Sequence, residues 1–160
     1  MTSASGSTVF YLDSSALAKR YVVEIGSAWV EALCRPTVGY TIATARITKA
    51  ESAAAFARKL RDGGLTPANY VNALRDLAHD FAYRYVLVDA DETLVDLAVD
   101  LTKRQKLRGY DAIQLAAALT LNDLLMQTSL APLTFVCADE DLVRSAQGEG
   151  LATDNPNLHP

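Results

Sequence analysis

The chain has 160 residues, half of them hydrophobic, which suits one hydrophobic core and leaves little room for a second. Its formal net charge is −4, from 15 basic and 19 acidic residues, so any contact with phosphate must come from a local basic patch. Residues 1–8 are polar, and no apolar run approaches the roughly 20 residues of a membrane span. We therefore expect a single domain over residues 1–160, and neither secretion nor membrane insertion.

The cysteines and histidines form no recognisable metal-binding motif. Cys34 and Cys137 lie far apart, and His79 and His159 have no metal-ligand spacing, which argues against a zinc site. Cys137 lies in the apolar run 133–138, where a free thiol behaves as a small buried hydrophobic group. Two thiols without a motif fit a cytoplasmic protein.

The first part of the chain predicts two strands and two helices. Residues 9–12 form a β-branched and aromatic run typical of a strand, and Asp13 directly after it can cap a helix over residues 16–21. A second helix is expected over about 24–33, and a short strand over 40–43.

The middle of the chain predicts three longer helices and one strand. The alanine-rich stretch from about 45 to 61 favours a helix that ends at the glycines 63–64. The next helix is expected to begin at residues 66–67, and its apolar residues recur at i, i+3, i+4 and i+7. Residues 85–88 are typical of a strand, and an amphipathic helix follows over about 94–106.

The last part predicts a buried helix and two further strands. Residues 111–126 are apolar on more than one face, which is typical of a central buried helix. A strand over 133–138, a closing helix over 139–148 and a last strand over 151–153 follow. Short apolar runs that alternate with helices predict an α/β fold with a mostly parallel sheet, in which ligands bind beyond the carboxyl ends of the strands.

Four acids lie at the boundaries of these elements: Asp13, Glu51, Asp111 and Asp139. Each alone has a structural explanation, because Asp13 and Asp139 can cap helices, Asp111 can favour a helix N-terminus, and residues 48–51 match a capping box. Together they suggest a cluster, since two of them end strands and two lie on alanine-rich helices that can approach closely. Two carboxylates about 4 Å apart repel by roughly 4 kcal/mol at an effective dielectric constant near 20, so such a cluster needs a cation or protons.

Oxygen ligands of this kind suit a hard divalent cation. Mg²⁺ binds a few carboxylates together with waters and phosphate oxygens, and Mn²⁺ is a plausible substitute. Such an ion lowers the pKa of a bound water, which can then attack a phosphodiester. No histidine, cysteine or serine nucleophile is required.

At these residues the chain resembles the PIN-domain family and, within it, the VapC-type toxin ribonucleases of VapBC toxin–antitoxin systems. The resemblance runs from about residue 9 to 156, and four segments carry it: 9–19 around Asp13, 48–54 around Glu51, 108–116 around Asp111, and 135–142 around Asp139. The first and third segments are specific in combination, whereas an isolated helix acid such as Glu51 is a weak signal.

The resemblance implies a PIN-like three-layer α/β/α fold, with a mostly parallel central sheet of four to five short strands and about seven helices. It also implies a metal-dependent endoribonuclease in which Asp13, Glu51, Asp111 and Asp139 take the catalytic and metal-binding positions, with Mg²⁺ or Mn²⁺ as cofactor. The Ser15 hydroxyl is either a supporting group beside Asp13 or a plain helix-start hydroxyl. Asp141 is the substitute for the fourth acid if Asp139 points away.

Partners follow from the same resemblance. They are an RNA substrate, a small VapB-like antitoxin that inserts a basic side chain among the carboxylates, and a second copy of the chain in a homodimer. A compact basic run directly before Asp111 can contact RNA phosphates or can simply be solvated at a helix C-terminus: Lys103, Arg104, Lys106 and Arg108. Four other basic residues could lie on the same rim: Lys19, Arg20, Arg46 and Lys49.

Two alternatives to a ribonuclease remain. The first is a receiver-like signalling or binding module with an acidic metal pocket, although a receiver has paired acids after its first strand, where this chain has Asp13-Ser14-Ser15. A haloacid-dehalogenase-like phosphatase is not one of them, because it would have a second Asp at position 15, which is serine. The other alternative is a non-catalytic PIN-like protein that only binds its partner or RNA, and the presence of all four acids argues against it.

Overall fold

The computed structural model describes residues 6–160 of the chain, so Met1–Ser5 of the polar N-terminal segment lie outside the described residues. Five strands form one sheet in the order β3-β2-β1-β4-β5, and every pairing is parallel. They are β1 (Val9–Leu12), β2 (Thr41–Ala45), β3 (Val86–Val88), β4 (Thr134–Val136) and β5 (Ala152–Asp154). The predicted parallel sheet is confirmed.

Seven α-helices are present in the described part of the chain, as predicted. They are α1 (Ser14–Leu17), α2 (Ser27–Leu33), α3 (Thr48–Arg61), α4 (Pro67–Tyr83), α5 (Glu92–Arg104), α6 (Gly109–Gln127) and α7 (Glu140–Gly148). Three 3₁₀ turns complete the fold: η1 (Ala18–Arg20), η2 (Pro36–Val38) and η3 (Pro156–Leu158). Over residues 6–160, no helix is both long and apolar enough to cross a membrane.

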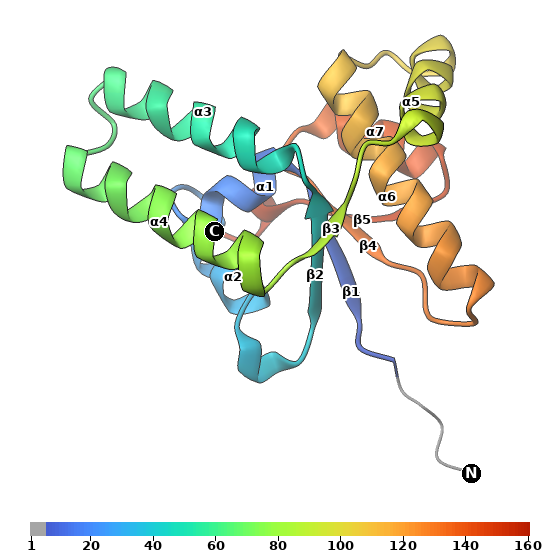
Figure 1. The fold of residues 1–160 in the computed structure, drawn as a ribbon, viewed down its shortest axis with the longest axis horizontal. Helices are drawn as coiled ribbons and strands as arrows, with labels where there is room; N and C mark the ends of the chain where they lie inside the picture. The colour runs from blue at the N-terminus through green and yellow to red at the C-terminus, as the bar shows by residue number, and fades with distance from the viewer. Residues whose placement is uncertain (1–5) are drawn as a thin grey trace.

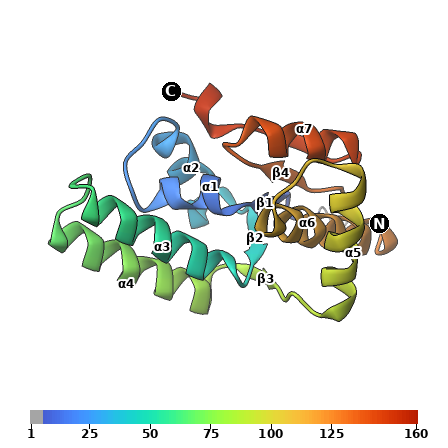
Figure 2. The same ribbon diagram turned by 90° about the horizontal axis from the view of Figure 1, so that it is seen from above.

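The sheet is the middle of three layers, with α1 to α4 on one side and α5 to α7 on the other (Figures 1 and 2). Alternate residues of a strand face opposite layers, so Tyr11 and Phe135 pack with α5, α6 and α7, whereas Leu12 and Val136 pack with α1 to α4. The predicted central helix is α6, which buries four consecutive residues completely, from Leu115 to Ala118. Its small alanines let it lie close to the sheet.

Two local predictions were wrong. The predicted helix start at residue 45 is three residues early, because Thr44 and Ala45 are fully buried and extend β2 beside β3. The predicted capping box at residues 48–51 does not form either. The N-cap of α3 is Ile47, without a side-chain bond, and the Thr48 hydroxyl is buried and bonded to Thr44 at 2.9 Å. Tertiary contacts take this hydroxyl away from the helix end.

The C-terminal turn η3 packs against the start of α2. Gly26 has φ +84, and a Cβ built on it would lie 2.2 Å from the backbone oxygen of Pro156. Only glycine fits both this left-handed conformation and this close approach. The contact fixes the C-terminal segment beside the loop that follows β4, where the Asn157 amide donates a hydrogen bond to the Ala138 carbonyl at 3.4 Å.

Candidate active site

The strand order places the candidate site at the boundary between β1 and β4. On one side of this boundary β1 is followed outward by β2 and β3, and on the other side β4 is followed outward by β5. The boundary is therefore the switch point of the sheet, where ligands bind in open parallel sheets. Asp13 directly follows β1, and Asp139 lies three residues after Val136. The order also differs from the 2-1-3-4-5 order of receiver-like folds, which weighs against the signalling alternative.

Asp13 is a buried carboxylate, with 3% of its surface exposed. One oxygen, Oδ1, accepts hydrogen bonds from the Ser15 hydroxyl at 2.7 Å and the Ala16 N–H at 2.9 Å. The other, Oδ2, accepts one from the Cys137 thiol at 3.2 Å. Burial raises the pKa of Asp13 from 3.8 to about 6, and these hydrogen bonds only partly oppose the rise.

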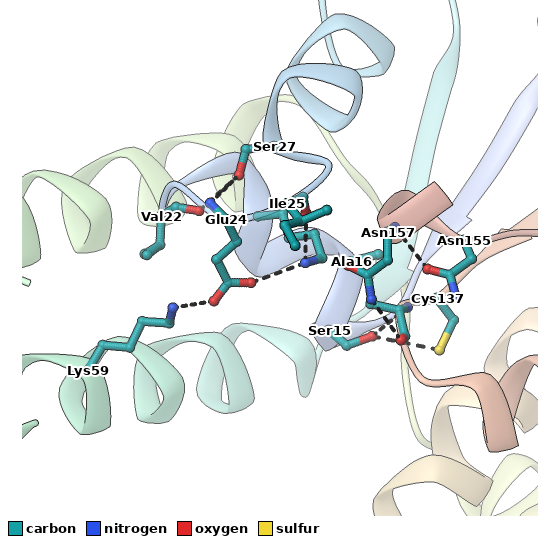
Figure 3. Close-up of polar contacts among 12 residues, drawn as sticks. Ser15, Ala16, Val22, Glu24, Ile25, Ser27, Lys59, Cys137, Asn155 and Asn157 are labelled. Atoms are coloured by element: carbon teal, nitrogen blue, oxygen red, sulfur yellow. Dashed lines mark hydrogen bonds and ion pairs between the residues drawn. The ribbon is translucent and has the colours of Figure 1, made fainter. Parts of the chain in front are cut away.

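Ser15 connects the ends of the two central strands. Its hydroxyl donates to Asp13 after β1 and accepts the backbone N–H of Ala138, after β4, at 2.9 Å. The same hydroxyl lies 3.6 Å from the Cys137 sulfur (Figure 3). The cap of α1 is Asp13 itself, so the Ser15 hydroxyl contacts the acid and does not cap the helix.

Glu51 is held by a buried polar network that the sequence analysis missed. Gln114, which is 1% exposed, donates from its amide nitrogen to Glu51 Oε2 at 2.6 Å and to the Thr48 hydroxyl at 2.8 Å. Its amide oxygen accepts the Tyr11 hydroxyl at 2.7 Å. Burial raises the pKa of Glu51, the bond from Gln114 opposes the rise, and the charge of Asp111 adds to it. The available sequence signal was Gln114 itself, an amide that interrupts the apolar run of α6 one turn after Asp111.

Asp111 and Asp139 lie close enough to influence each other. Burial raises the pKa of Asp111, and the charge of Asp139 raises it further. Asp139 is exposed and caps α7, because its Oδ1 accepts the N–H groups of Asp141 at 2.8 Å and Leu142 at 3.2 Å. The Asp141 side chain is 82% exposed and forms an ion pair with Arg144 on the surface of the same helix. Asp139 is therefore the acid of the two that lies toward Asp111.

A cleft of about 1100 Å³ lies between α1 and α3 on one side and α5 and α6 on the other. Glu51, Asp111 and Ser15 line it directly, Asp13 lies beneath its surface and reaches it through Ser15, and Asp139 does not line it. Within residues 6–160, no three Asp, Glu, His or Cys side chains lie close enough together to hold an ion by themselves. Glu51 and Asp111 therefore face one end of an open cleft, and the acids do not form a closed cage.

The predicted basic run is only partly directed toward the cleft. Arg108 lines the cleft near Asp111. Lys103 is paired with Asp100 at 2.7 Å and Arg104 with Glu149 at 2.9 Å, and neither lines the cleft. Lys106 is exposed outside it.

Other basic residues occupy the far end of the cleft. Lys19, one of the suggested rim residues, lines it together with Arg58 and Lys59 of α3, which the sequence analysis did not single out. The sequence signal for Arg58 and Lys59 was their spacing from Glu51, because positions 51, 55, 58 and 59 fall on one face of a helix. Arg20 and Arg46 instead pair with Asp80 and Asp89, away from the cleft.

A three-layer parallel α/β fold with carboxylates around a cleft at its switch point defines a PIN-like protein. The chain belongs to the family of VapC ribonucleases. It is 33% identical over 116 residues to ribonucleases VapC45 and VapC49 of Mycobacterium tuberculosis, a match that covers 71% of this chain and 76% of each relative. No family model matches the chain.

Solved structures show the same fold. VapC20 of Mycobacterium tuberculosis, a sarcin–ricin loop cleaving toxin, superposes with a TM-score of 0.57 at 14% identity over 94% of this chain and 99% of its own. A chain of the VapBC2 complex of Rickettsia felis, bound to a promoter DNA fragment, superposes with a TM-score of 0.59 at 13% identity over 92% and 98%. The PIN-like three-layer fold predicted from the resemblance is thus confirmed.

Proposed function

We propose that the chain is a divalent-metal-dependent endoribonuclease, acting as the toxin of a type II toxin–antitoxin pair, that hydrolyses RNA phosphodiester bonds in the acidic end of the cleft. One observation carries the proposal. A buried carboxylate, Asp13, lies at the switch point of the sheet with no basic hydrogen-bond donor among residues 6–160, while Glu51 and Asp111 line the cleft above it. The family relatives are ribonucleases, which supports the same chemistry.

The donor set fits a hard cation. The candidate ligands are Asp13, Glu51, Asp111 and Asp139, which offer only carboxylate oxygens, and their open arrangement suits Mg²⁺ or Mn²⁺ that is bound by one or two carboxylates and keeps several waters. When bound, such an ion polarises a water and offsets negative charge on the phosphate. Burial raises the pKa values of Asp13, Glu51 and Asp111, and a bound cation would favour their charged forms.

The remaining side chains position the acids. Gln114 fixes one oxygen of Glu51, and Ser15 fixes Asp13 relative to the loop after β4. Arg108 lies beside Asp111 at the mouth of the cleft, where its guanidinium can bind a phosphate oxygen of the substrate. Gln114 and Ser15 thus hold the acids in place, and Arg108 would orient the substrate phosphate.

The test is cleavage of RNA by the purified chain with and without Mg²⁺ or Mn²⁺, beside two variants. Asp111→Asn should reduce the rate at least about a hundredfold, since even the outer partners of metal ligands typically cost 10- to 100-fold. The matched control is Asp141→Asn, which removes an exposed acid outside the cleft and should leave the rate unchanged. Equal rates for both variants, or cleavage that persists in EDTA, would refute the proposal.

We also propose a small VapB-like antitoxin that inserts a basic side chain among the carboxylates, and a homodimer. Structural neighbours that are toxin–antitoxin complexes support the first. Analytical ultracentrifugation of the purified chain tests the homodimer, whose molecular mass should be twice that of one chain. Addition of the antitoxin should stop cleavage by the wild-type chain and should protect it from Mn²⁺ binding.

A further inference from the structure

An ionic cluster lines the end of the cleft opposite the acids. The carboxylate of Glu24 bridges two lysines, with Oε2 at 3.2 Å from Lys19 Nζ and Oε1 paired with Lys59 (Figure 3). Lys19 also donates to the Ile25 carbonyl at 2.9 Å, and its side chain is only 6% exposed. The Lys59 side chain is 36% exposed, so it is the member of the cluster that can move.

The loop that carries Glu24 is fixed independently of Lys59. The backbone N–H of Glu24 donates to the Ser27 hydroxyl at 2.8 Å, and that hydroxyl donates to the Val22 carbonyl at 3.1 Å. Lys19 stays beside Glu24 through the bond to Ile25. If Lys59 turns toward another anion, Glu24 therefore keeps one cationic partner and does not become an isolated charge.

This end of the cleft has an excess of positive charge. Arg58, one residue before Lys59, also lines the cleft and is exposed, and among residues 6–160 it forms no ion pair. Three cationic side chains thus lie near one carboxylate, in a chain whose net charge is −4. An anion from outside the chain would balance the excess.

Helix α3 connects this basic end to the acidic end. Glu51, Ala55, Arg58 and Lys59 line the same cleft at i, i+4, i+7 and i+8, which places the basic pair roughly 10 to 12 Å along the axis from Glu51. At the acidic end, Tyr110 lines the cleft beside Asp111 and is 66% exposed, so its ring is open to stacking by a base. Cations in a groove with an exposed aromatic ring are the usual features of single-strand binding.

We propose that Arg58 and Lys59 form a phosphate subsite for single-stranded RNA, where Lys59 exchanges Glu24 for a backbone phosphate next to the one that lies at the acids. The inference rests on the proposed ribonuclease function and names how the substrate is held. Lys19 is a positioning residue, because it keeps Glu24 paired when Lys59 leaves. An acidic protein segment is the competing occupant of the subsite.

The test is binding of a fluorescently labelled single-stranded oligoribonucleotide in EDTA over a series of salt concentrations. Arg58→Gln should weaken binding roughly two- to fivefold and reduce the slope of log affinity against log salt by about 0.7, the value for one lost phosphate contact on a single strand. Its matched control is Arg61→Gln, an exposed arginine on the same helix that does not line the cleft, which should change neither quantity. Arg58 has no ion pair to lose, so its variant should fold normally.

Lys59→Gln should weaken RNA binding and reduce the salt slope in the same way. Its matched control, Lys49→Gln, should change neither quantity. An equal slope for Arg58→Gln and Arg61→Gln overturns the inference. The inference is also overturned if Arg58→Gln loses affinity for a labelled glutamate decapeptide but keeps its full affinity for the RNA. An acidic protein would then be the ligand.

Failure of the proposed function looks different. In that case the wild type binds the RNA with the full salt slope but does not cleave it when Mg²⁺ or Mn²⁺ is added. Asp111→Asn should lose cleavage and keep the salt dependence that Arg58 supplies.

Discussion

Asp13 and Asp80 are both buried carboxylates, and their surroundings are opposite. Each is 3% exposed. Asp80, on α4, opposes the cost of burial with bonds from Arg20 at 2.8 Å, the Tyr21 hydroxyl at 2.9 Å and Arg84 at 3.2 Å, and its pKa is lowered. In the described part of the chain Asp13 has only neutral donors, and burial raises its pKa to about 6.

The difference separates a structural carboxylate from a functional one. A buried charge is stable only when it is paired, and the chain supplies the partner for Asp80 within its own fold. For Asp13 it supplies hydrogen bonds that fix the geometry and leaves the charge uncompensated. A carboxylate that the fold orients without neutralising is suited to an external cation.

Loss of the Asp80 carboxylate is expected to have the largest effect on stability. Asp80→Asn should lower the free energy of unfolding at pH 7 by about 3 to 5 kcal/mol, because Arg20, with 17% of its side chain exposed, is left without its counter-ion. Urea denaturation measures the change. A loss below about 1 kcal/mol would place Asp80 among ordinary surface ion pairs and would break the comparison.

The matching change at Asp13 should have the opposite sign. Between its unfolded pKa of 3.8 and its folded pKa of about 6, the folded state binds the proton more tightly, so the free energy of unfolding falls as pH rises through this window. Asp13→Asn removes this penalty and should stabilise the chain in EDTA at pH 7 by roughly 2 to 3 kcal/mol, with little gain at pH 4. Urea denaturation at both pH values checks it, and a gain that does not depend on pH would contradict the assigned environment.

The smallest effect is expected at the more exposed arginine beside Asp80. Arg84 has 27% of its side chain exposed and also donates to the Cys34 carbonyl at 3.2 Å. Arg84→Gln should lower the free energy of unfolding by only about 1 kcal/mol, because Arg20 still neutralises the Asp80 carboxylate and the Tyr21 hydroxyl still donates to it. A cost equal to that of Asp80→Asn would show that the pairing is not shared in this way.

The fold and the positions of the acids could be predicted because they depend on local signals. An apolar run that stops at an acid marks the end of a strand, and this placed Asp13 and Asp139 at the carboxyl edge of the sheet. The apolar stretch of α6 likewise predicted a central helix. These signals lie within a few residues of the feature that they predict.

The groups that hold the acids could not be predicted in the same way. The bond from Tyr11 to Gln114 joins residues 103 positions apart, and the bond from Cys137 to Asp13 joins residues 124 apart. A compact basic run also says little about direction, since Lys103 and Arg104 lie at the end of a helix and point to partners away from the cleft. Asp80 carried no special signal, because an acid in an amphipathic helix is usually solvated.

The most direct test of the central claim is Mn²⁺ binding measured by electron paramagnetic resonance with the wild type, Asp111→Asn and Asp141→Asn. If the acids around the cleft form a cation site, the wild type and Asp141→Asn should bind the ion alike, and Asp111→Asn should bind it at least about tenfold more weakly. Equal binding by all three proteins, or binding by none of them, would contradict the claim that the uncompensated carboxylates at the switch point hold a divalent metal.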